Sequence, residues 1–322
     1  MVACSGGADS VALAVAIASA TPDLVVAHVV HDMRSLEEAL GDRDSVKRLA
    51  ELIGVPFVDA AIEVKSLKGN SEGHARRLRY AALGELAAIH RCGFVATAHH
   101  ADDQMESVIM ALLRGAGPRG LAGIAPKRKL RPEVELIRPM LGVTRAEARR
   151  FCETLGLDWR EDATNSDESR LRNVVRARVL PVLEALRPGA TIRGARSADL
   201  LRQVGAIFKD DVARAFAGAS NQAVPETERA DRREWDRGAL RMLPAAVLIE
   251  GLRAAFQEMS GGRGADRLGG RRLDAAARAI GSKSTQPKRF EWPEEFLLDV
   301  TAAKVTLRRT RTLPESGVDS GR

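Results

Sequence analysis

The chain has 322 residues and a formal net charge of +7, with 45% hydrophobic and 29% charged residues. This composition is that of a globular protein of about two domains, and it excludes a disordered or fibrous chain. The three cysteines are widely spaced and form no CxxC pair, so they fit neither a disulfide scaffold nor a zinc or iron–sulfur frame.

The basic excess suits a polyanionic partner, because contacts with phosphates drive affinity for nucleic acids. An aromatic content of 4% argues against a single-strand binder built on stacked rings. No stretch is long and apolar enough to span a membrane. Residues 11–20 are mostly apolar, but no positive charge precedes them and Asp9 lies at their edge, so a signal peptide is not expected. We therefore expect a cytoplasmic protein.

The first 135 residues alternate short apolar runs with helical patterns. We expect strands at residues 2–4, 24–30, 56–62 and 94–98, and helices at residues 10–19, 36–53, 72–90 and 102–113. Strands that alternate with helices are typical of a parallel sheet covered on both faces. The sequence therefore predicts an α/β fold with an open parallel sheet.

The rest of the chain extends this domain and then changes character. Helices are expected at 144–155, with Thr144 as N-cap, at 171–186, 192–216, 243–259 and 273–280, and strand-like runs at 288–299 and 303–309. We predict a first domain over residues 1–190, a connecting helix and linker over 191–233, a small α+β domain over 234–312 and a disordered tail over 313–322.

The strongest chemical signal is the hexapeptide Ser5-Gly6-Gly7-Ala8-Asp9-Ser10 between the first strand and the first helix. Two adjacent glycines let the backbone approach a ligand, and the N–H groups at a helix N-terminus attract an anion. The hydroxyls of Ser5 and Ser10 add donors. The alternative is a simple Gly-Gly turn that caps a helix. The hexapeptide lacks the lysine of a Walker A loop, and it predicts a different phosphate site.

A second glycine pattern, GxGxxG at residues 115–120, suggests a dinucleotide fold when it is taken alone. It follows a predicted helix, and Pro118 interrupts it, so the strand–turn–helix context of that fold is missing. We interpret it as a flexible loop.

Residues 99–106, His-His-Ala-Asp-Asp-Gln-Met-Glu, follow the fourth predicted strand. His99 and Asp103 are four residues apart and so face one side of a helix. A zinc site would need further ligands, and a plain helix N-terminus would explain only the two aspartates through the helix dipole. Ligands bind beyond the carboxyl ends of parallel strands, which favours the edge of an active site.

These motifs resemble those of a known family. Residues 5–10 match the SGGxDS signature of the PP-loop ATP pyrophosphatases, and residues 97–104, 112–115 and 120–123 closely resemble the lysidine synthetase branch of that family. Further matches lie at residues 27–31, 72–76, 79–80, 137–141, 161–165 and 171–173, with Pro181 following. The resemblance is dense over residues 2–187 and traceable from 243 to 307. Residues 1–190 would then be a PP-loop ATP-binding catalytic domain.

The resemblance implies ATP and Mg²⁺ as cofactors. In the family reaction, ATP adenylates C2 of the wobble cytidine of tRNA(Ile) with a CAU anticodon, and pyrophosphate leaves. The amine of L-lysine then attacks C2 and displaces AMP. A homodimer is an expectation by family analogy alone.

The same resemblance assigns roles to particular residues. The loop Ser5, Gly6, Gly7, Ala8, Asp9 and Ser10 would bind ATP, with His28 on the second strand beside the adenine, and Asp9 would hold Mg²⁺. Asp9, Arg76, His99 and Asp103 are the expected catalytic residues. An acidic group must hold the lysine ammonium and later take its proton, for which Asp103, His99 and Glu106 are the candidates in that order.

Basic residues mark a predicted tRNA surface. From Ala111 to Pro132 there are six basic residues and no acidic one, which favours contacts with phosphates over a merely solubilising loop. We assign Arg114, Arg119, Lys127, Arg128 and Lys129 to this surface, and also Arg172, which matches a family position linked to tRNA.

Three other functions stay open at this stage. A tRNA thiolase of the same family would need placed cysteines. A non-catalytic tRNA-binding protein would not need the intact phosphate loop. A GMP-synthetase-like enzyme would usually bring a glutaminase domain or partner.

Overall fold

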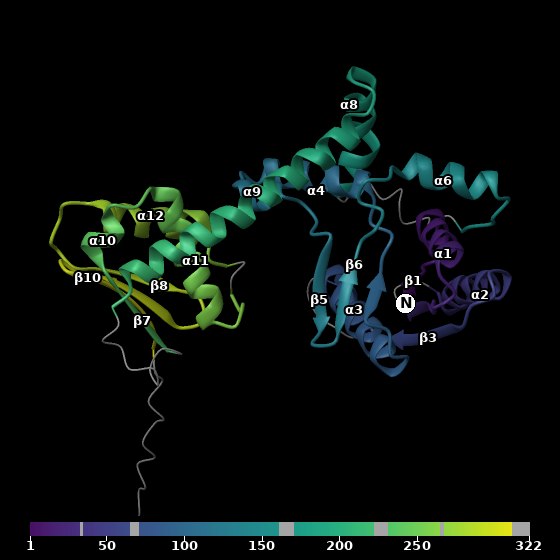
Figure 1. The fold of residues 1–322 in the computed structure, drawn as a ribbon, viewed down its shortest axis with the longest axis horizontal. Coiled ribbons are helices and arrows are strands. Elements are labelled where there is room, and N and C mark those ends of the chain that lie inside the picture. Colours follow the sequence, from purple (N-terminus) through teal and green to yellow (C-terminus); the bar gives the residue numbers. More distant parts are fainter. Residues whose placement is uncertain (33–34, 65–70, 161–170, 222–230, 265–266, 311–322) are drawn as a thin grey trace, which may run out of the picture. The chain divides into compact units, whose positions relative to one another are not determined.

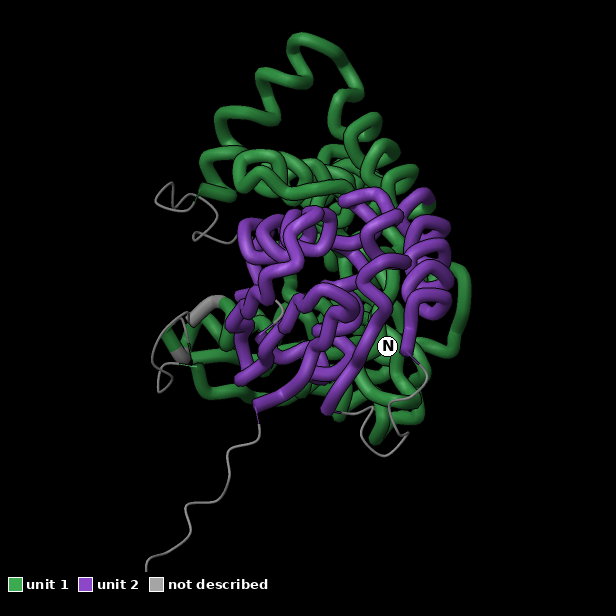
Figure 2. The backbone as a smooth tube through the Cα atoms, turned by 90° about the vertical axis from the view of Figure 1, so that its left-hand side faces the viewer, with its two compact units in different colours: residues 1–203 green, residues 204–322 purple. Residues whose placement is uncertain are grey.

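The computed structural model describes residues 1–32, 35–64, 71–160, 171–221, 231–264 and 267–310. The chain divides into two compact units, residues 1–203 and residues 204–322, which are coloured separately in Figure 2. The boundaries expected from the sequence at residues 190 and 233 remain predictions, and the expected tail at 313–322 lies outside the described residues.

A six-stranded sheet forms the centre of unit 1 (Figure 1). Its strands are β1 (Val2–Ala3), β2 (Val26–His31), β3 (Phe57–Ile62), β4 (Phe94–Ala96), β5 (Lys127–Arg131) and β6 (Val134–Ile137). Their order is β3-β2-β1-β4-β6-β5, and every pairing is parallel except that of β5 with β6. The predicted α/β class with a parallel sheet is confirmed.

Helices cover both faces of this sheet. They are α1 (Ala8–Ala20), α2 (Leu36–Leu52), α3 (Ser71–Ile89), α4 (Ala101–Leu113), α5 (Pro118–Leu121) and α6 (Arg145–Thr154). Side chains of a strand point alternately to its two faces. Val2 and Val26 therefore join one core with α1, α2 and α6, whereas Ala27 and Val95 join the other with α3.

Helix α6 and strand β5 differ in how well their sequences reveal them. Thr144 is the N-cap of α6, as predicted, and its hydroxyl accepts a hydrogen bond from the Glu147 backbone N–H at 3.1 Å. The basic stretch at 127–131, for which the sequence indicated no strand, forms β5. Its run of charges hides the period-two pattern of a strand, because only Leu130 is apolar.

The helix expected at 171–186 is broken by a wider turn. It consists of α7 (Leu171–Val174), the π-helix η2 (Val175–Val179) and α8 (Leu180–Leu186). Pro181 has no N–H to donate and its ring crowds the preceding turn, which suits the wider π-helical spacing. Helix α9 (Ala190–Ala219) then continues for 30 residues into unit 2.

Unit 2 contains a four-stranded antiparallel sheet of order β7-β10-β9-β8. The strands are β7 (Arg232–Asp236), β8 (Lys288–Trp292), β9 (Phe296–Val300) and β10 (Lys304–Arg309), and the helices are α10 (Arg237–Arg241), α11 (Ala245–Met259) and α12 (Gly270–Gly281). The run expected as one strand at 288–299 is a hairpin. Strand β7 was not expected, because Arg-Arg-Glu-Trp-Asp carries four charges.

A buried carboxylate lies in the sheet of unit 2. Glu234 is 5% exposed and lies 2.8 Å from Arg232 and 3.2 Å from Lys304. Burial acts to raise the pKa of Glu234, but hydrogen bonds from Arg232, Lys304 and Asn221 lower it to about 2.

Among the described helices of the whole chain, none is long and apolar enough to cross a membrane.

Candidate active site

The candidate site lies where two neighbouring parallel strands end. β1 and β4 pair directly, with Val2 opposite Ala96, and each runs through a short loop into a helix, α1 or α4. In open α/β sheets ligands bind at the carboxyl ends of such strands. The topology therefore brings together the two motifs, residues 5–10 and 99–106, that are far apart in the sequence.

The first loop is held in a fixed shape by its own polar groups. Gly6 has a φ of +89°, a conformation that L side chains rarely adopt. The Ser10 hydroxyl donates to the Gly7 carbonyl at 2.9 Å and accepts from the Ser5 N–H at 3.1 Å. Among the described residues no side chain caps the start of α1. The Ser10 N–H donates to the Gly7 carbonyl at 3.0 Å, so the N–H groups of Ala8 and Asp9 are the ones available for an anion.

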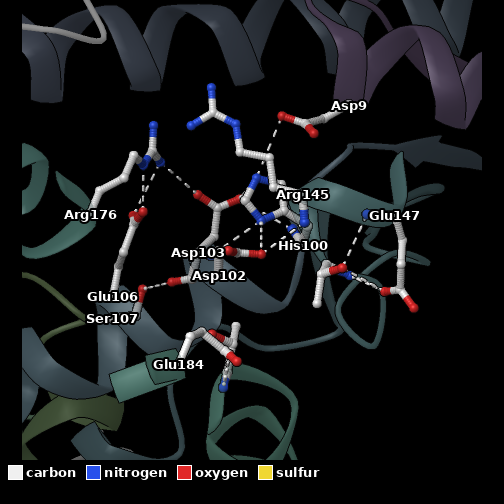
Figure 3. Close-up of polar contacts among 12 residues, drawn as sticks. Asp9, His100, Asp102, Asp103, Glu106, Ser107, Arg145, Glu147, Arg176 and Glu184 are labelled. Atoms are coloured by element: carbon white, nitrogen blue, oxygen red, sulfur yellow. Dashed lines mark hydrogen bonds and ion pairs between the residues drawn. The ribbon is translucent and has the colours of Figure 1, made fainter. Parts of the chain in front are cut away.

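His100 links the two motifs, although the sequence did not single it out. It is 3% exposed, and its Nε2 lies 3.5 Å from carboxylate oxygens of both Asp9 and Asp103 (Figure 3). Its Nδ1 lies 3.4 Å from Asp102 Oδ2. Burial acts to lower the pKa of His100, but the three aspartates raise it to about 10. This pKa favours the charged imidazole, which lies between the three carboxylates.

A second set of ion pairs extends from α4 to the helix around the π turn. Arg172 Nε and Arg176 Nε each lie 2.6 Å from an oxygen of Glu106, whose side chain is fully buried. Both guanidiniums also reach Asp103 Oδ1, at 3.2 and 3.4 Å. The sequence placed Arg172 on the tRNA surface, but the structure places it among the acidic residues of the site.

The charges of this cluster do not balance. Among the described residues, four carboxylates pair with three cations, so negative groups outnumber positive ones by one in this part of the cluster. The carboxylates are Asp9, Asp102, Asp103 and Glu106, and the cations are His100, Arg172 and Arg176. Asp9 Oδ1 is moreover buried without a hydrogen-bond partner. Such a group would be stabilised by a cation beside it.

The unpartnered Asp9 oxygen favours the expected Mg²⁺ at Asp9. Among the described residues no group of three His, Cys, Asp or Glu side chains is placed to hold a metal ion. Mg²⁺ is commonly held by one or two carboxylates, with substrate phosphates and water as the remaining ligands. Asp9, at the start of α1, suits such a site.

The other expected site residues surround the cluster. Burial lowers the pKa of His99 to about 4, against the opposing effect of Asp103, so its imidazole is neutral. The His99 Nδ1 lies 3.0 Å from the Thr97 hydroxyl. His28 on β2 is buried, and its Nδ1 lies 2.8 Å from the Cys4 carbonyl oxygen. Arg76 is exposed on α3, with its guanidinium 5.2 Å from the centre of the Tyr80 ring.

The remaining basic residues of the predicted tRNA surface are exposed in unit 1. Arg114 caps the end of α4, Arg119 lies on α5, and the other three lie on β5. The matched motif at residues 161–165 lies outside the described residues. The sequence missed the roles of His100 and Arg176 in the cluster. The four-residue spacing of Arg172 and Arg176 was the one available signal that they share a helix face.

Comparison with known proteins identifies relatives of this chain. The model of the family described as the PP-loop domain matches residues 1–183. The tRNA(Ile)-lysidine synthase of Geobacter sulfurreducens is 40% identical over 62% of this chain and 43% of its own length. Those of Symbiobacterium thermophilum and Deinococcus deserti are 34% and 36% identical over 88% and 92% of this chain, and 60% and 55% of their own lengths. The chain thus spans about half the length of these relatives.

A solved structure gives the same fold at lower similarity. A U34-tRNA thiolase from Methanococcus maripaludis, solved with its [4Fe-4S] cluster, has a TM-score of 0.52 and 19% identity. The match covers 62% of this chain and 71% of that chain. At this identity the likeness concerns the fold alone.

Proposed function

Because this chain belongs to the family of PP-loop domains, we propose that it is an ATP-dependent ligase that joins L-lysine to a tRNA. Its substrate would be tRNA(Ile) with a CAU anticodon, and the product would be lysidine at the wobble position. The observation that carries the proposal is the uncapped phosphate loop before α1, which adjoins a cluster where, among the described residues, carboxylates outnumber cations by one.

In the first step the C2 oxygen of cytidine attacks the α-phosphorus of ATP, and pyrophosphate leaves. The backbone N–H groups at the start of α1 hold the departing phosphates, and preorganised donors of this kind stabilise developing charge. Mg²⁺ at Asp9 would neutralise phosphate charge when it is bound. His100 fixes the orientation of Asp9 through its 3.5 Å contact and acts as a positioning residue.

In the second step the lysine amine attacks C2, the C–O bond to AMP breaks, and the amine loses its protons. We assign the incoming ammonium to Asp103, whose side chain is 14% exposed whereas that of Glu106 is fully buried. Asp9 and Asp102 are more exposed, at 27% and 24%, but Asp9 is assigned to Mg²⁺ and Asp102 accepts a hydrogen bond from the Arg145 N–H. The charge of Asp103 acts to raise the pKa of the neighbouring His99, and the neutral imidazole of His99 can accept a proton. Glu106 is covered by two guanidiniums and so positions Arg172 and Arg176 instead of touching lysine.

The cysteines do not favour a sulfur-transfer reaction. Burial raises the pKa of both Cys4 and Cys152, so neither thiol is activated as a thiolate. No disulfide joins the described cysteines, and none of them belongs to a cluster of possible metal ligands in the described part of the chain. Neither Cys4 nor Cys152 therefore supports the thiolase alternative.

The test is incorporation of radiolabelled lysine. The protein would be incubated with lysine, ATP, Mg²⁺ and a tRNA(Ile) transcript that bears a CAU anticodon, with a tRNA(Met) transcript in parallel. We expect label in tRNA(Ile) only, with stoichiometric AMP and pyrophosphate. Release of AMP and pyrophosphate without label would refute the lysine substrate, and no nucleotide cleavage at all would indicate a binding protein.

Two variants sharpen this test. Asp103→Asn should abolish lysine transfer, because the amide cannot hold and deprotonate an ammonium. Asp23→Asn removes the same charge from an exposed position before β2, at the opposite end of the strand, and should leave transfer unchanged. Equal activities of the two variants would argue against a role for Asp103.

A further inference from the structure

Three arginines from separate elements gather around one tyrosine of α3. The guanidinium carbon of Arg128, on β5, lies 4.4 Å from the centre of the Tyr80 ring, and that of Arg76 lies 5.2 Å from it. Arg138, which follows β6, interacts with the Tyr80 hydroxyl. Aromatic rings attract guanidinium groups through their faces, so Tyr80 holds the arginines in place.

These arginines lack an acidic partner in the described part of the chain. No ion pair with a described carboxylate joins Arg76, Arg128 or Arg138, whereas the clusters around Asp103, Glu106 and Glu234 combine both signs. Arg138 is only 6% exposed, and its Nε is buried without a hydrogen-bond partner. Burial lowers the pKa of Arg138, and the charges of Arg128 and Arg76 lower it further.

An unpaired buried guanidinium beside two like charges is costly unless an anion joins it. Its Nη1 donates to the Ala125 carbonyl at 2.5 Å, which fixes the side chain but supplies no charge. Arg76 and Arg128 are exposed, so an anion can reach the cluster from solvent. The three arginines therefore form an anion site in which Arg138 is buried and Arg76 and Arg128 are exposed to solvent.

The position of the cluster indicates which anion it takes. Arg76 and Arg138 both act electrostatically on His99, so the cluster adjoins the candidate active site. Exposed Lys127 and Lys129 are the neighbours of Arg128 on β5, with side chains that alternate between the two faces of the sheet, so this edge strand is basic on both faces. A chain of phosphates can follow such an edge, whereas a single carboxylate would use only one point of it.

We infer that Arg76, Arg128 and Arg138, arranged around Tyr80, bind one phosphodiester of the RNA strand that carries the reacting nucleotide. Planar guanidinium groups match the geometry of phosphate oxygens and can bind them bidentately. The contact would fix where the strand enters the site. This inference deepens the proposed function and rests on it.

The first experiment measures binding of an anticodon stem-loop RNA with a CAU loop at several salt concentrations, without ATP or lysine. Arg128→Gln and Arg76→Gln should each weaken binding roughly tenfold or more, as expected for a lost charged hydrogen bond. Each should also lower the slope of log affinity against log salt by about one. Arg77→Gln, one residue along α3 and exposed, is the matched control and should change neither quantity.

The second experiment locates the phosphate. Neutral methylphosphonates would replace single phosphates around the reacting cytidine, one at a time. At one position the replacement should weaken RNA binding by the protein without substitutions. With that RNA, the protein without substitutions and Arg128→Gln should bind equally well. Additive losses at every position would overturn the inference, as would a loss in Arg77→Gln equal to that in Arg128→Gln.

These results separate the inference from the proposed ligase activity. If Arg128→Gln raised the KM for lysine while RNA affinity and salt slope stayed unchanged, the cluster would hold the lysine carboxylate, and the phosphate site would be wrong. If the unmodified protein transferred no lysine but the methylphosphonate effect appeared, the phosphate site would stand and the ligase proposal would fall.

Discussion

The buried pair of Glu106 and Arg176 allows a quantitative prediction about stability. Glu106 is 0% exposed, and its two oxygens receive contacts of 2.6, 2.6 and 3.2 Å from the guanidiniums of Arg172 and Arg176. Removal of one partner from a buried ion pair costs about 3–5 kcal/mol, because the other charge is left desolvated. Here the side chains of Arg172 and Arg176 are 39% and 23% exposed, and both keep Asp103 as a partner. We therefore expect the lower end of that range.

The perturbation is Glu106→Gln. It should lower the free energy of unfolding of unit 1 by about 3 kcal/mol, which for a unit of this size lowers Tm by roughly 6–12 °C. Calorimetry of the full chain measures this change in the transition that is assigned to unit 1. The assignment uses Gly251→Ala in unit 2, where an added Cβ would lie 1.9 Å from the Phe216 ring and so lower the other transition.

A double-mutant cycle with Arg176→Gln isolates the pair itself. We expect a coupling energy of about 2 kcal/mol for Glu106 with Arg176, compared with less than about 0.5 kcal/mol for the exposed pair of Asp211 and Arg214. A coupling for Glu106 and Arg176 no larger than that of the exposed pair would refute the reasoning. Such a result would mean that water solvates the remaining carboxylate as well as the guanidinium of Arg176 does.

Three further predictions concern other parts of the chain. Asp9→Asn should abolish Mg²⁺-dependent release of pyrophosphate from ATP but preserve the circular dichroism spectrum, and pyrophosphate release at the normal rate would contradict a metal role for Asp9. Gly6→Ala should destabilise unit 1 by about 1–3 kcal/mol and weaken ATP binding, because alanine disfavours the φ of +89°; unchanged nucleotide binding by calorimetric titration would count against the loop. The pKa of Glu234 is lowered to about 2, so its contribution of roughly 3 kcal/mol to the stability of unit 2 is present above pH 4.5 and is lost as pH falls toward 2. In acid unfolding, Glu234→Gln should remove this dependence on pH. An unaltered acid unfolding profile would disprove the contribution of Glu234.

The phosphate loop could be predicted from the sequence because its signal is local. A strand, two glycines, hydroxyls and a helix start all lie within ten residues, and the backbone geometry of Gly6 follows from that pattern. The alternation of strands and helices likewise predicted the parallel sheet. Both predictions depend on neighbours along the chain, where periodicity and turn chemistry are informative.

The acidic cluster could be predicted only in part. Its aspartates follow a strand and were recognised, but the partners of Glu106 are Arg172 and Arg176, 66 and 70 residues away in sequence. The π turn at Val175–Val179 sets the direction of Arg176, and no periodic pattern reveals such a turn. Strand β5 was missed for a related reason, since its pairing with β6 depends on a sheet edge and not on its own charged residues.

The edge position of β5 also affects how the protein avoids aggregation. An open edge strand offers unpaired backbone groups to any other extended chain, and natural proteins commonly protect such edges with lysine or arginine. Four of the five residues of β5 are basic, so a second copy that approached this edge would meet charge repulsion. The basic side chains that we propose for RNA binding therefore also disfavour the addition of a further strand at this edge of the sheet.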